Sequence, residues 1–316
     1  MQRIVISASR RTDIPAFYMP WFMQQIKQGF FEVHHPFGRT SIRVPAAADQ
    51  VHTLVFWSKN FGPFLEGGFG QQLVQKRYHL FFNFTINSAH TILEPAVPPT
   101  EVRIAQLARL ADLFGPEAIQ WRFDPICYYR ASSGKESDNL AQLPHIARRV
   151  AALGIRICIT SFVDLYRKVQ RRAAHSDVTL IDPPMDRKIE QIVAMTRLLA
   201  PLGVQLQLCC ERALLAALPE EAKVVGAACI PNDRLAALYG ADLSLAKDSG
   251  QRVDAGCGCR VSRDIGSYQL HPCRHNCLFC YANPQGEPKA PILARHDGES
   301  SKTKDHSKTR SKGVPR

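Results

Sequence analysis

Short apolar runs alternate with longer amphipathic runs along most of the 316-residue chain. Short runs rich in β-branched residues are typical of buried strands, whereas apolar residues three and four positions apart are typical of helices. The pattern predicts seven strands, at 3–9, 53–58, 79–86, 118–125, 155–161, 204–208 and 223–228. Because helical runs lie between these strands, the sequence favours parallel β/α units with right-handed crossovers.

These units predict an α/β fold, namely a parallel (β/α) barrel that is partial and TIM-barrel-like, over residues 1–250. An open doubly wound sheet is the alternative. The clearest helices begin at Thr100, a candidate N-cap, and at Asp186. A cysteine-rich segment at 251–288 is expected to pack on the barrel.

The C-terminal residues 289–316 are expected to form a disordered basic tail, because they contain few apolar side chains. The tail holds eight Lys and Arg against three Asp and Glu, which accounts for +5 of the net charge of +12. A basic tail can contact nucleic acid, but this composition favours a solvated segment without a partner.

Three predicted strands carry polar side chains at alternate positions. The sets are Gln120, Arg122 and Asp124; Arg156, Cys158 and Thr160; and Gln205, Gln207 and Cys209. Alternate residues of a strand point to the same face of a sheet. If the apolar faces pack on helices, the polar faces line the interior, and we expect a wide polar lumen able to hold a large ligand. An antiparallel sheet with one face in solvent is the alternative.

Charged residues follow several of the predicted strands, where parallel β/α folds place their chemistry. The basic residues among them are Arg10, Arg11, Lys59 and Arg122. Such side chains pair with a carboxylate or phosphate of a cofactor. Asp13 and Asp124 are expected to orient these cations or to bind a ribose hydroxyl. In the alternative, Asp13 caps the following helix and Asp124 pairs with Arg122.

Three cysteines lie close together near the C-terminus, in the run HPCRHNCLFCYAN. Cys273, Cys277 and Cys280 have the spacing C-x3-C-x2-C. Three thiolates on one loop can bind three irons of a [4Fe–4S] cluster and leave the fourth iron open. One alternative is a structural zinc knot with His271 or His275 as the fourth ligand. Another is three cysteines without a metal.

A second group of cysteines is spread over the C-terminal third. Cys257 and Cys259 form a C-x-C pair, while Cys209 and Cys229 each follow a predicted strand. Four thiolates suit zinc or a closed iron–sulfur cluster, so we predict a second metal site. Alternatively, Cys209 and Cys229 are small buried hydrophobes. The remaining cysteines, Cys127, Cys158 and Cys210, are expected to be packing residues.

The cysteine loop, with its aromatic Phe279 before the last cysteine, resembles the signature of radical S-adenosylmethionine (SAM) enzymes. The chain up to about residue 283 also resembles the bacterial domain-of-unknown-function family number 1848. The motifs that carry this second resemblance are ISASRRTDIP at 6–15, VFWSKN at 55–60, RFDPI at 122–126, SFVDLYRK at 161–168, CCE at 209–211 and the cysteine-rich run at 257–283. Radical SAM enzymes place this loop near the N-terminus, before their barrel, whereas here it follows the barrel-like part.

These resemblances imply a radical SAM-like iron–sulfur protein that cleaves SAM reductively and acts on an unknown substrate, with no catalytic residue assigned. A reducing partner such as flavodoxin or ferredoxin would then be required. One alternative function is a non-catalytic iron–sulfur protein for electron transfer or sensing. The other is a zinc-stabilised protein that binds nucleic acid through its basic surface.

The sequence also predicts where the protein acts. Its start shows no charged segment followed by a long apolar run, so no signal peptide is expected. No apolar run approaches the roughly 20 residues of a membrane span, so no membrane is expected. We therefore expect a cytoplasmic protein, in which ten cysteines serve metal binding or catalysis rather than disulfides.

Overall fold

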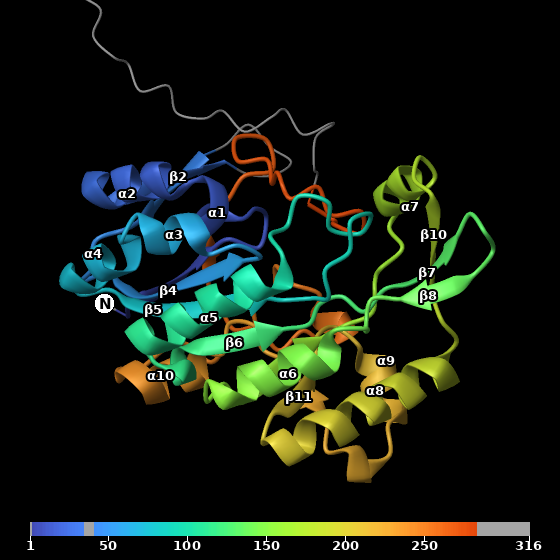
Figure 1. Ribbon diagram of the computed structural model, residues 1–316. Helices are drawn as coiled ribbons and strands as arrows, with labels where there is room; N and C mark the ends of the chain where they lie inside the picture. The colour runs from blue at the N-terminus through green and yellow to red at the C-terminus, as the bar shows by residue number, and fades with distance from the viewer. Residues whose placement is uncertain (1, 35–40, 283–316) are drawn as a thin grey trace, which may run out of the picture. The chain divides into compact units, whose positions relative to one another are not determined.

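The computed structural model describes residues 2–34 and 41–282, and its centre is a large parallel sheet (Figure 1). The sheet has eight strands in the order β12-β11-β9-β6-β5-β4-β1-β13, and every neighbouring pair is parallel. Its strands are β1 (Ile4–Ala8), β4 (Val51–Ser58), β5 (His79–Thr85), β6 (Ile119–Arg122), β9 (Ile157–Thr160), β11 (Gln205–Leu208), β12 (Val225–Gly226) and β13 (Arg263–Asp264). The first seven of these in chain order coincide with the seven predicted strands.

Helices connect most of these strands, as the alternating pattern predicted. They are α1 (Ile14–Phe17), α2 (Met19–Gln28), α3 (Gly62–Glu66), α4 (Phe69–Gln75), α5 (Thr100–Phe114), α6 (Leu143–Ala152), α7 (Arg167–Ala173), α8 (Met185–Leu199), α9 (Arg212–Ala217) and α10 (Asn232–Tyr239). Short 3-10 turns are η1 (Pro116–Ala118), η2 (Ala200–Leu202), η3 (Glu220–Ala222) and η4 (Val253–Ala255). Thr100 begins α5 but does not cap it, because its hydroxyl donates to Gln142 Oε1 at 2.7 Å.

Two smaller sheets were not predicted from the sequence. One is the antiparallel pair β2 (Phe30–His34) and β3 (Ser41–Pro45). The other consists of β7 (Tyr128–Ala131), β8 (Glu136–Asp138) and β10 (Val178–Ile181), in the order β10-β7-β8. These strands are short insertions between β/α units, so they do not disturb the main alternation.

The predicted barrel is not closed. A closed barrel pairs its first and last strands, but β12 and β13 are opposite edges of the sheet, and no ladder joins them within the described residues. Both edge strands contain only two residues. The chain between them does not extend the sheet, because it crosses one face of the sheet before it returns beside β1.

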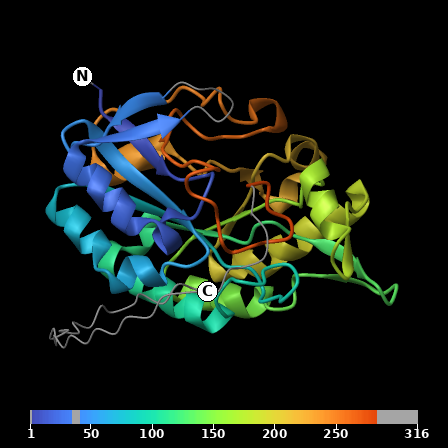
Figure 2. The same ribbon diagram turned by 90° about the horizontal axis from the view of Figure 1, so that it is seen from above.

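The two faces of the sheet are covered differently. One face carries the main core, which includes Phe56, Phe82 and Trp121 and packs against the helices that connect the strands. The other face carries a smaller core that includes Phe81, Ile159 and residues of α10 and the 227–259 segment. In Figure 2 the orange C-terminal segment lies on the other side of the strands from the blue-to-green helices.

The wide polar lumen predicted from the sequence is filled by the protein itself. Asn83 and Gln120 point away from the helices, and both are almost fully buried. Asn83 Nδ2 donates to the carbonyl of Cys229 at 2.9 Å, and Gln120 Nε2 donates to that of Ala228 at 3.3 Å. These two side chains, which we call the polar row, therefore bind backbone carbonyls of the irregular segment after β12. That segment forms few backbone hydrogen bonds with neighbouring strands, so its carbonyls need other partners.

The polar face predicted for β9 is also wrong. Cys158 is paired in register with Trp121, and both side chains belong to the helix-facing core. Ile159 is in register with Arg122 and Gln207. An apolar residue therefore lies at this point on the face of the sheet that is turned away from the helices, which we call the inner face. Cys158 behaves as a small buried hydrophobe, which is common for a free thiol.

The described part of the predicted cysteine-rich segment, 251–282, packs against the sheet and its loops. Residues 283–288 and the predicted tail at 289–316 lie outside the described residues. Among the helices of the described chain, none combines the length and the apolar character required to cross a membrane.

Candidate metal centres

The loop that carries Cys273, Cys277 and Cys280 lies against the turn that follows β1. The imidazole Nε2 of His275 is 2.8 Å from a carboxylate oxygen of Asp13. The hydroxyl of Tyr281 donates to the carbonyl of Arg10 at 2.5 Å. These contacts join residues more than 250 positions apart, and they place the loop at the carboxyl edge of the sheet, as predicted for parallel strands.

Asp13 holds this arrangement together. One carboxylate oxygen accepts from the backbone N–H of Ala16 at 3.0 Å, which caps α1. Ser58 Oγ donates to the same oxygen at 2.7 Å, and the backbone N–H of Lys59 donates to the other at 2.9 Å. With His275 added, these partners occupy the acceptor sites of a carboxylate. The contacts favour the structural alternative for Asp13 over a ribose contact.

The three thiols of the loop are largely buried beside cations. Burial raises the pKa of Cys273 to about 12 and raises that of Cys277 well above its usual range. The nearby Lys59 opposes both increases. Burial also raises the pKa of Cys280, and Lys59 and Arg172 oppose it. A metal would supply the positive charge that these thiols need in order to ionise.

A buried ionic network of Lys59, Glu94 and Arg103 lies against the cysteine loop. Lys59 Nζ is 2.6 Å from Glu94 Oε1 and lies over the ring of Phe279, 5.3 Å from its centroid. Arg103 Nη1 is 3.7 Å from the other carboxylate oxygen of Glu94, and Asn87 Nδ2 donates to Glu94 at 2.9 Å. Although burial favours the neutral acid, Lys59 and Arg103 lower the pKa of Glu94. Glu94 is therefore an anion between two cations.

The two histidines that could complete a zinc knot are placed differently. Both ring nitrogens of His275 face protein acceptors, because Nδ1 is 3.2 Å from the carbonyl of Ala96 and Nε2 contacts Asp13. His271 packs on Trp21 with ring centroids 4.1 Å apart, and its buried Nδ1 has no hydrogen-bond partner. Burial lowers the pKa of His271 to about 4. This arrangement disfavours His275 as a zinc ligand and leaves His271 neutral.

Five other thiols lie close together in one cluster, which we call the five-thiol ring. Cys209 Sγ lies 3.8 Å from Cys210 Sγ and 4.0 Å from Cys229 Sγ. Cys257 lies near Cys210 and Cys259, and Cys259 lies near Cys229. The structure therefore brings together the four cysteines predicted for a second metal site. It adds Cys210, which was expected to be a packing residue.

Local backbone geometry brings Cys210 into this ring. Successive residues of a strand point to opposite faces, so Cys210 would normally point away from Cys209. Its φ of 60° is in the left-handed region and turns the chain immediately after β11. A non-glycine residue in this region is uncommon and often marks a functional site.

The inner face of the sheet positions Cys229. Asn83 and Gln120 bind the carbonyls of Cys229 and Ala228, and Arg122 donates to the Sγ of Cys229. Contacts with the side chains of Cys210 and Cys229 lower the pKa of Cys209, and the nearby Arg122 lowers it further. The polar row of β5 and β6 therefore helps to assemble the ring.

Gly258 allows the C-x-C pair to approach the ring. A Cβ at this position would lie 2.6 Å from the carbonyl oxygen of Ala227, which belongs to the backbone and cannot rotate away. We expect the variant Gly258→Ala to lose about 1–3 kcal/mol of its free energy of unfolding, as in other overpacked sites. Thermal and denaturant unfolding measure this loss.

Gly226→Ala is the matched control, because an added Cβ there meets only Leu215 Cδ2 at 3.7 Å. It should unfold close to the wild-type temperature. If Gly258→Ala is as stable as this control, the close approach of the C-x-C pair to Ala227 is not what requires glycine.

The remaining predicted cofactor residues lie between the two cysteine groups and are mostly paired. Arg10 and Arg122 both lie near the Trp57 ring, with their guanidinium carbons 5.5 and 5.4 Å from its centroid. Arg10 is 3.7 Å from Asp248, and Arg122 is paired with Asp124, as the structural alternative predicted. Arg11 Nη1 donates to the carbonyl of Gly266 at 3.0 Å.

Asp124 and Lys59 keep more contact with solvent than Arg122 does. Their side chains are 19% and 16% exposed, against 8% for Arg122. Ser161 Oγ donates to Asp124 Oδ1 at 2.5 Å. Because Lys59 is beside the loop cysteines and Asp124 is beside the five-thiol ring, a ligand bound between the two groups would contact both.

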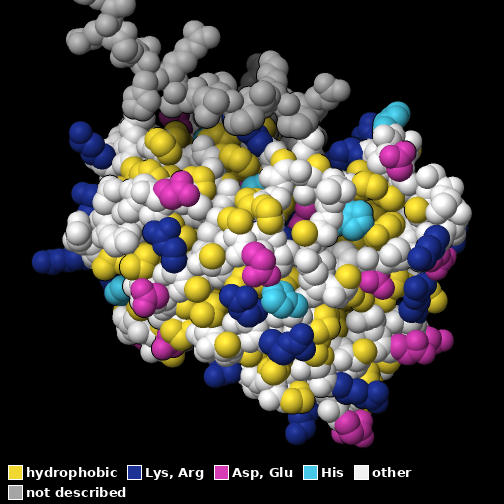
Figure 3. Space-filling model, viewed as in Figure 1, with side chains coloured by type: hydrophobic (Ala, Val, Ile, Leu, Met, Phe, Trp, Pro, Cys, Tyr) yellow, Lys and Arg dark blue, Asp and Glu magenta, His cyan; other side chains and the backbone are white. Residues whose placement is uncertain are grey.

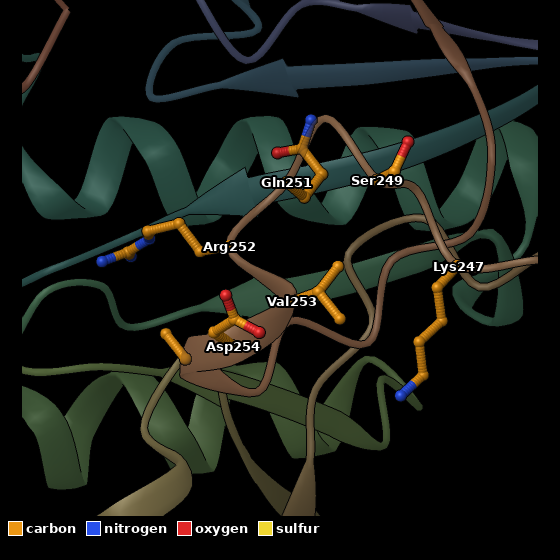
Figure 4. Close-up of a pocket in the computed structure, with 7 residues that line it drawn as sticks. Lys247, Ser249, Gln251, Arg252, Val253 and Asp254 are labelled. Atoms are coloured by element: carbon orange, nitrogen blue, oxygen red, sulfur yellow. The ribbon is translucent and has the colours of Figure 1, made fainter.

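A cavity of about 530 Å³ lies close to the C-x-C pair, and residues from Lys247 to Ala255 line it. Figure 4 shows that Arg252, Lys247 and Gln251 point in different directions rather than toward a common centre. Arg252 is already paired with Asp164 at 2.7 Å. This cavity therefore lacks the converging polar groups expected of a ligand site.

The surface gives no particular support to nucleic-acid binding on the face shown in Figure 3. Lys and Arg side chains lie among Asp and Glu there and do not form a single basic patch. A basic stripe would be the electrostatic signature of a nucleic-acid interface. The basic residues from 289 onward lie outside the described chain.

Comparison with known proteins yields one family. A family model described as a domain of unknown function, DUF1848, matches residues 5–282, a range that includes both cysteine groups. No curated protein matches the chain.

Proposed function

Because the chain belongs to the DUF1848 family, a family of unknown function, we propose a function from its own residues: it is a radical SAM-like iron–sulfur protein. In this proposal Cys273, Cys277 and Cys280 hold a [4Fe–4S] cluster at the carboxyl edge of the sheet. The observation that carries it is a single buried loop with three thiols beside Lys59 and Arg172. Three thiolates leave one iron of such a cluster open.

Three thiolates on one loop match the ligand set of such a cluster. A zinc knot needs a fourth protein ligand; His275 has both ring nitrogens engaged by Asp13 and Ala96, so His271, whose Nδ1 has no hydrogen-bond partner, is the zinc alternative. The cations beside the loop balance the negative charge of thiolates in a buried position. When bound, a cluster with an open iron would bind SAM and supply the electron that splits its sulfonium group.

The chain's own residues would fix and shield the loop. Arg172 donates to the carbonyls of Leu278 and Cys280, and thereby holds the C-terminal half of the loop. The Asp13–His275 contact holds the other half. Leu278 and Phe279 are buried in the same apolar cluster as Cys277. Lys59 and Asp124 are partly exposed and lie near the cysteines, so we expect them to contact a bound SAM.

The direct test is SAM cleavage by the reduced protein. Chain purified without oxygen and loaded with iron and sulfide is incubated with dithionite and SAM, and 5′-deoxyadenosine is measured by chromatography. We expect slow formation of 5′-deoxyadenosine and methionine even without the true substrate. A variant lacking the three loop cysteines is the control and should form neither product.

The opposite result has a clear meaning. A fully cluster-loaded protein that neither binds SAM nor forms 5′-deoxyadenosine contradicts the enzymatic proposal. It would instead support electron transfer or sensing by the same cluster.

A further inference from the structure

We propose that the five-thiol ring binds one thiophilic metal ion of the zinc class through four thiolates. The ring consists of Cys209, Cys210, Cys229, Cys257 and Cys259. It is separate from the Cys273–Cys280 loop, so this proposal does not depend on the proposed function. All ten cysteines are free thiols in the structure, and half of them gather at this one place.

The spacing of the sulfurs favours a single ion. A tetrahedral ion with Zn–S bonds of about 2.3 Å holds its sulfurs about 3.8 Å apart. The Sγ atom of Cys209 is 3.8 Å from that of Cys210 and 4.0 Å from that of Cys229. A cubane cluster binds each cysteine to a different iron, so its cysteine sulfurs lie farther apart than sulfurs that share one ion.

Small side-chain rotations would complete the ligand set. In the described part of the chain, no three Cys, His, Asp or Glu side chains are already arranged to hold a metal ion. A thiol changes position by rotating about one bond between staggered rotamers, without backbone movement. Cys209 and Cys210 are only half-buried, which leaves them more room to rotate than Cys229 and Cys259.

The charge around the ring is also suitable. Four thiolates around a divalent cation carry a net charge of about −2, which needs compensation in a buried site. Arg122 donates to Cys229, and Arg10 lies near Cys259. The ring thus lies beside two guanidinium groups, one on each of two neighbouring thiols.

Such an ion would fix the segment that covers the inner face of the sheet. Cys209 follows β11, Cys229 follows β12, and the C-x-C pair comes from the chain that crosses this face. One ion would therefore join three separate parts of an irregular segment. Because metal binding contributes to folding free energy, removal of the ion should lower the melting temperature.

Metal analysis of two reciprocal variants tests the proposal. The first is Cys229→Ser/Cys259→Ser, which removes two ring thiols, and the second is Cys273→Ala/Cys277→Ala/Cys280→Ala. Zinc and iron are measured separately by mass spectrometry in protein purified without oxygen. We expect about one zinc per chain in the wild type and in the loop variant, and none in the ring variant.

The proposal fails under three outcomes. One is a loop variant that keeps iron and contains no zinc, since the ring would then hold an iron–sulfur cluster. Another is a ring variant that keeps its zinc. The third is a wild-type protein without zinc in which all five ring thiols react freely.

A measurement on the wild-type chain covers the case in which the ring variant does not fold. Titration with a mercurial reagent should release about one zinc to a coloured chelator as four thiols react. Release of iron instead of zinc, or reaction of the thiols without any metal release, would overturn the assignment. A wild-type protein that keeps its zinc but does not cleave SAM would count against the proposed function alone.

Discussion

The variant Cys273→Ala/Cys277→Ala/Cys280→Ala is expected to lose all of the iron of the proposed cluster, which is about four irons per wild-type chain. The three thiols lie on one loop at the carboxyl edge of the sheet, and each is close to a cation that would stabilise its thiolate. Iron and sulfide analysis after anaerobic reconstitution measures this loss, and the brown colour should disappear with it.

The loop should keep its position in this variant, so the loss of iron can be separated from unfolding. Arg172 binds backbone carbonyls of the loop, and the Asp13–His275 contact does not involve the cysteines. Cys158→Ala is the matched control, because Cys158 is a buried thiol of the helix-facing core. Unchanged iron in the triple variant, or iron loss in the control as well, would refute the assignment.

The variant Glu94→Gln is expected to lose about 3–5 kcal/mol of its free energy of unfolding, the usual effect of breaking a buried ion pair. The side chains of Glu94 and Arg103 are 2% and 1% exposed, so Arg103 cannot exchange its partner for water. Glutamine has the same shape but no charge, and it leaves Lys59 and Arg103 buried beside each other without an anion. Denaturant unfolding at neutral pH measures the loss.

Glu101→Gln is the matched control for this change. Glu101 also contacts two basic side chains, His145 and Arg149, but it is 63% exposed. Exposed ion pairs contribute about 0–1 kcal/mol, so this variant should be nearly as stable as the wild type. Equal losses in the two variants would show that burial does not determine the effect.

The pH dependence of the Glu94 variant follows from the direction of the pKa shift. The pKa of Glu94 is lower in the folded state than its ordinary value, because Lys59 and Arg103 outweigh the effect of burial. The stability it contributes is therefore fully present above its unfolded-state pKa and is lost as pH falls through its folded-state pKa. The difference between wild type and Glu94→Gln should accordingly narrow in acid.

The predicted strands show which features local sequence determines. Seven strands of the large sheet were predicted because each is a short apolar run between turn or helix signals. Helices α5 and α8 were predicted for the same reason, from apolar residues on one helical face. The grouping of charged residues at the carboxyl edge also followed, because parallel strands end at the same side of a sheet.

Other features depend on contacts between distant parts of the chain. The sheet stays open because the segment after β12 covers its inner face, and Asn83 and Gln120 serve that segment instead of a lumen. Periodicity reports that a face is polar, but it does not report whether water, a ligand or backbone carbonyls will satisfy that face.

The cysteines divide in the same way. Sequence spacing alone grouped Cys273, Cys277 and Cys280, because three residues so close along the chain share one loop. The tertiary structure assigned Cys210 to the five-thiol ring, through a left-handed turn that alternation along a strand cannot predict. It also gave Asp13 a structural role, because its partner His275 lies 262 positions away in the chain. The local sequence determines which types of side chain lie close together along the chain. Only the fold determines which distant residues come near enough to bind them.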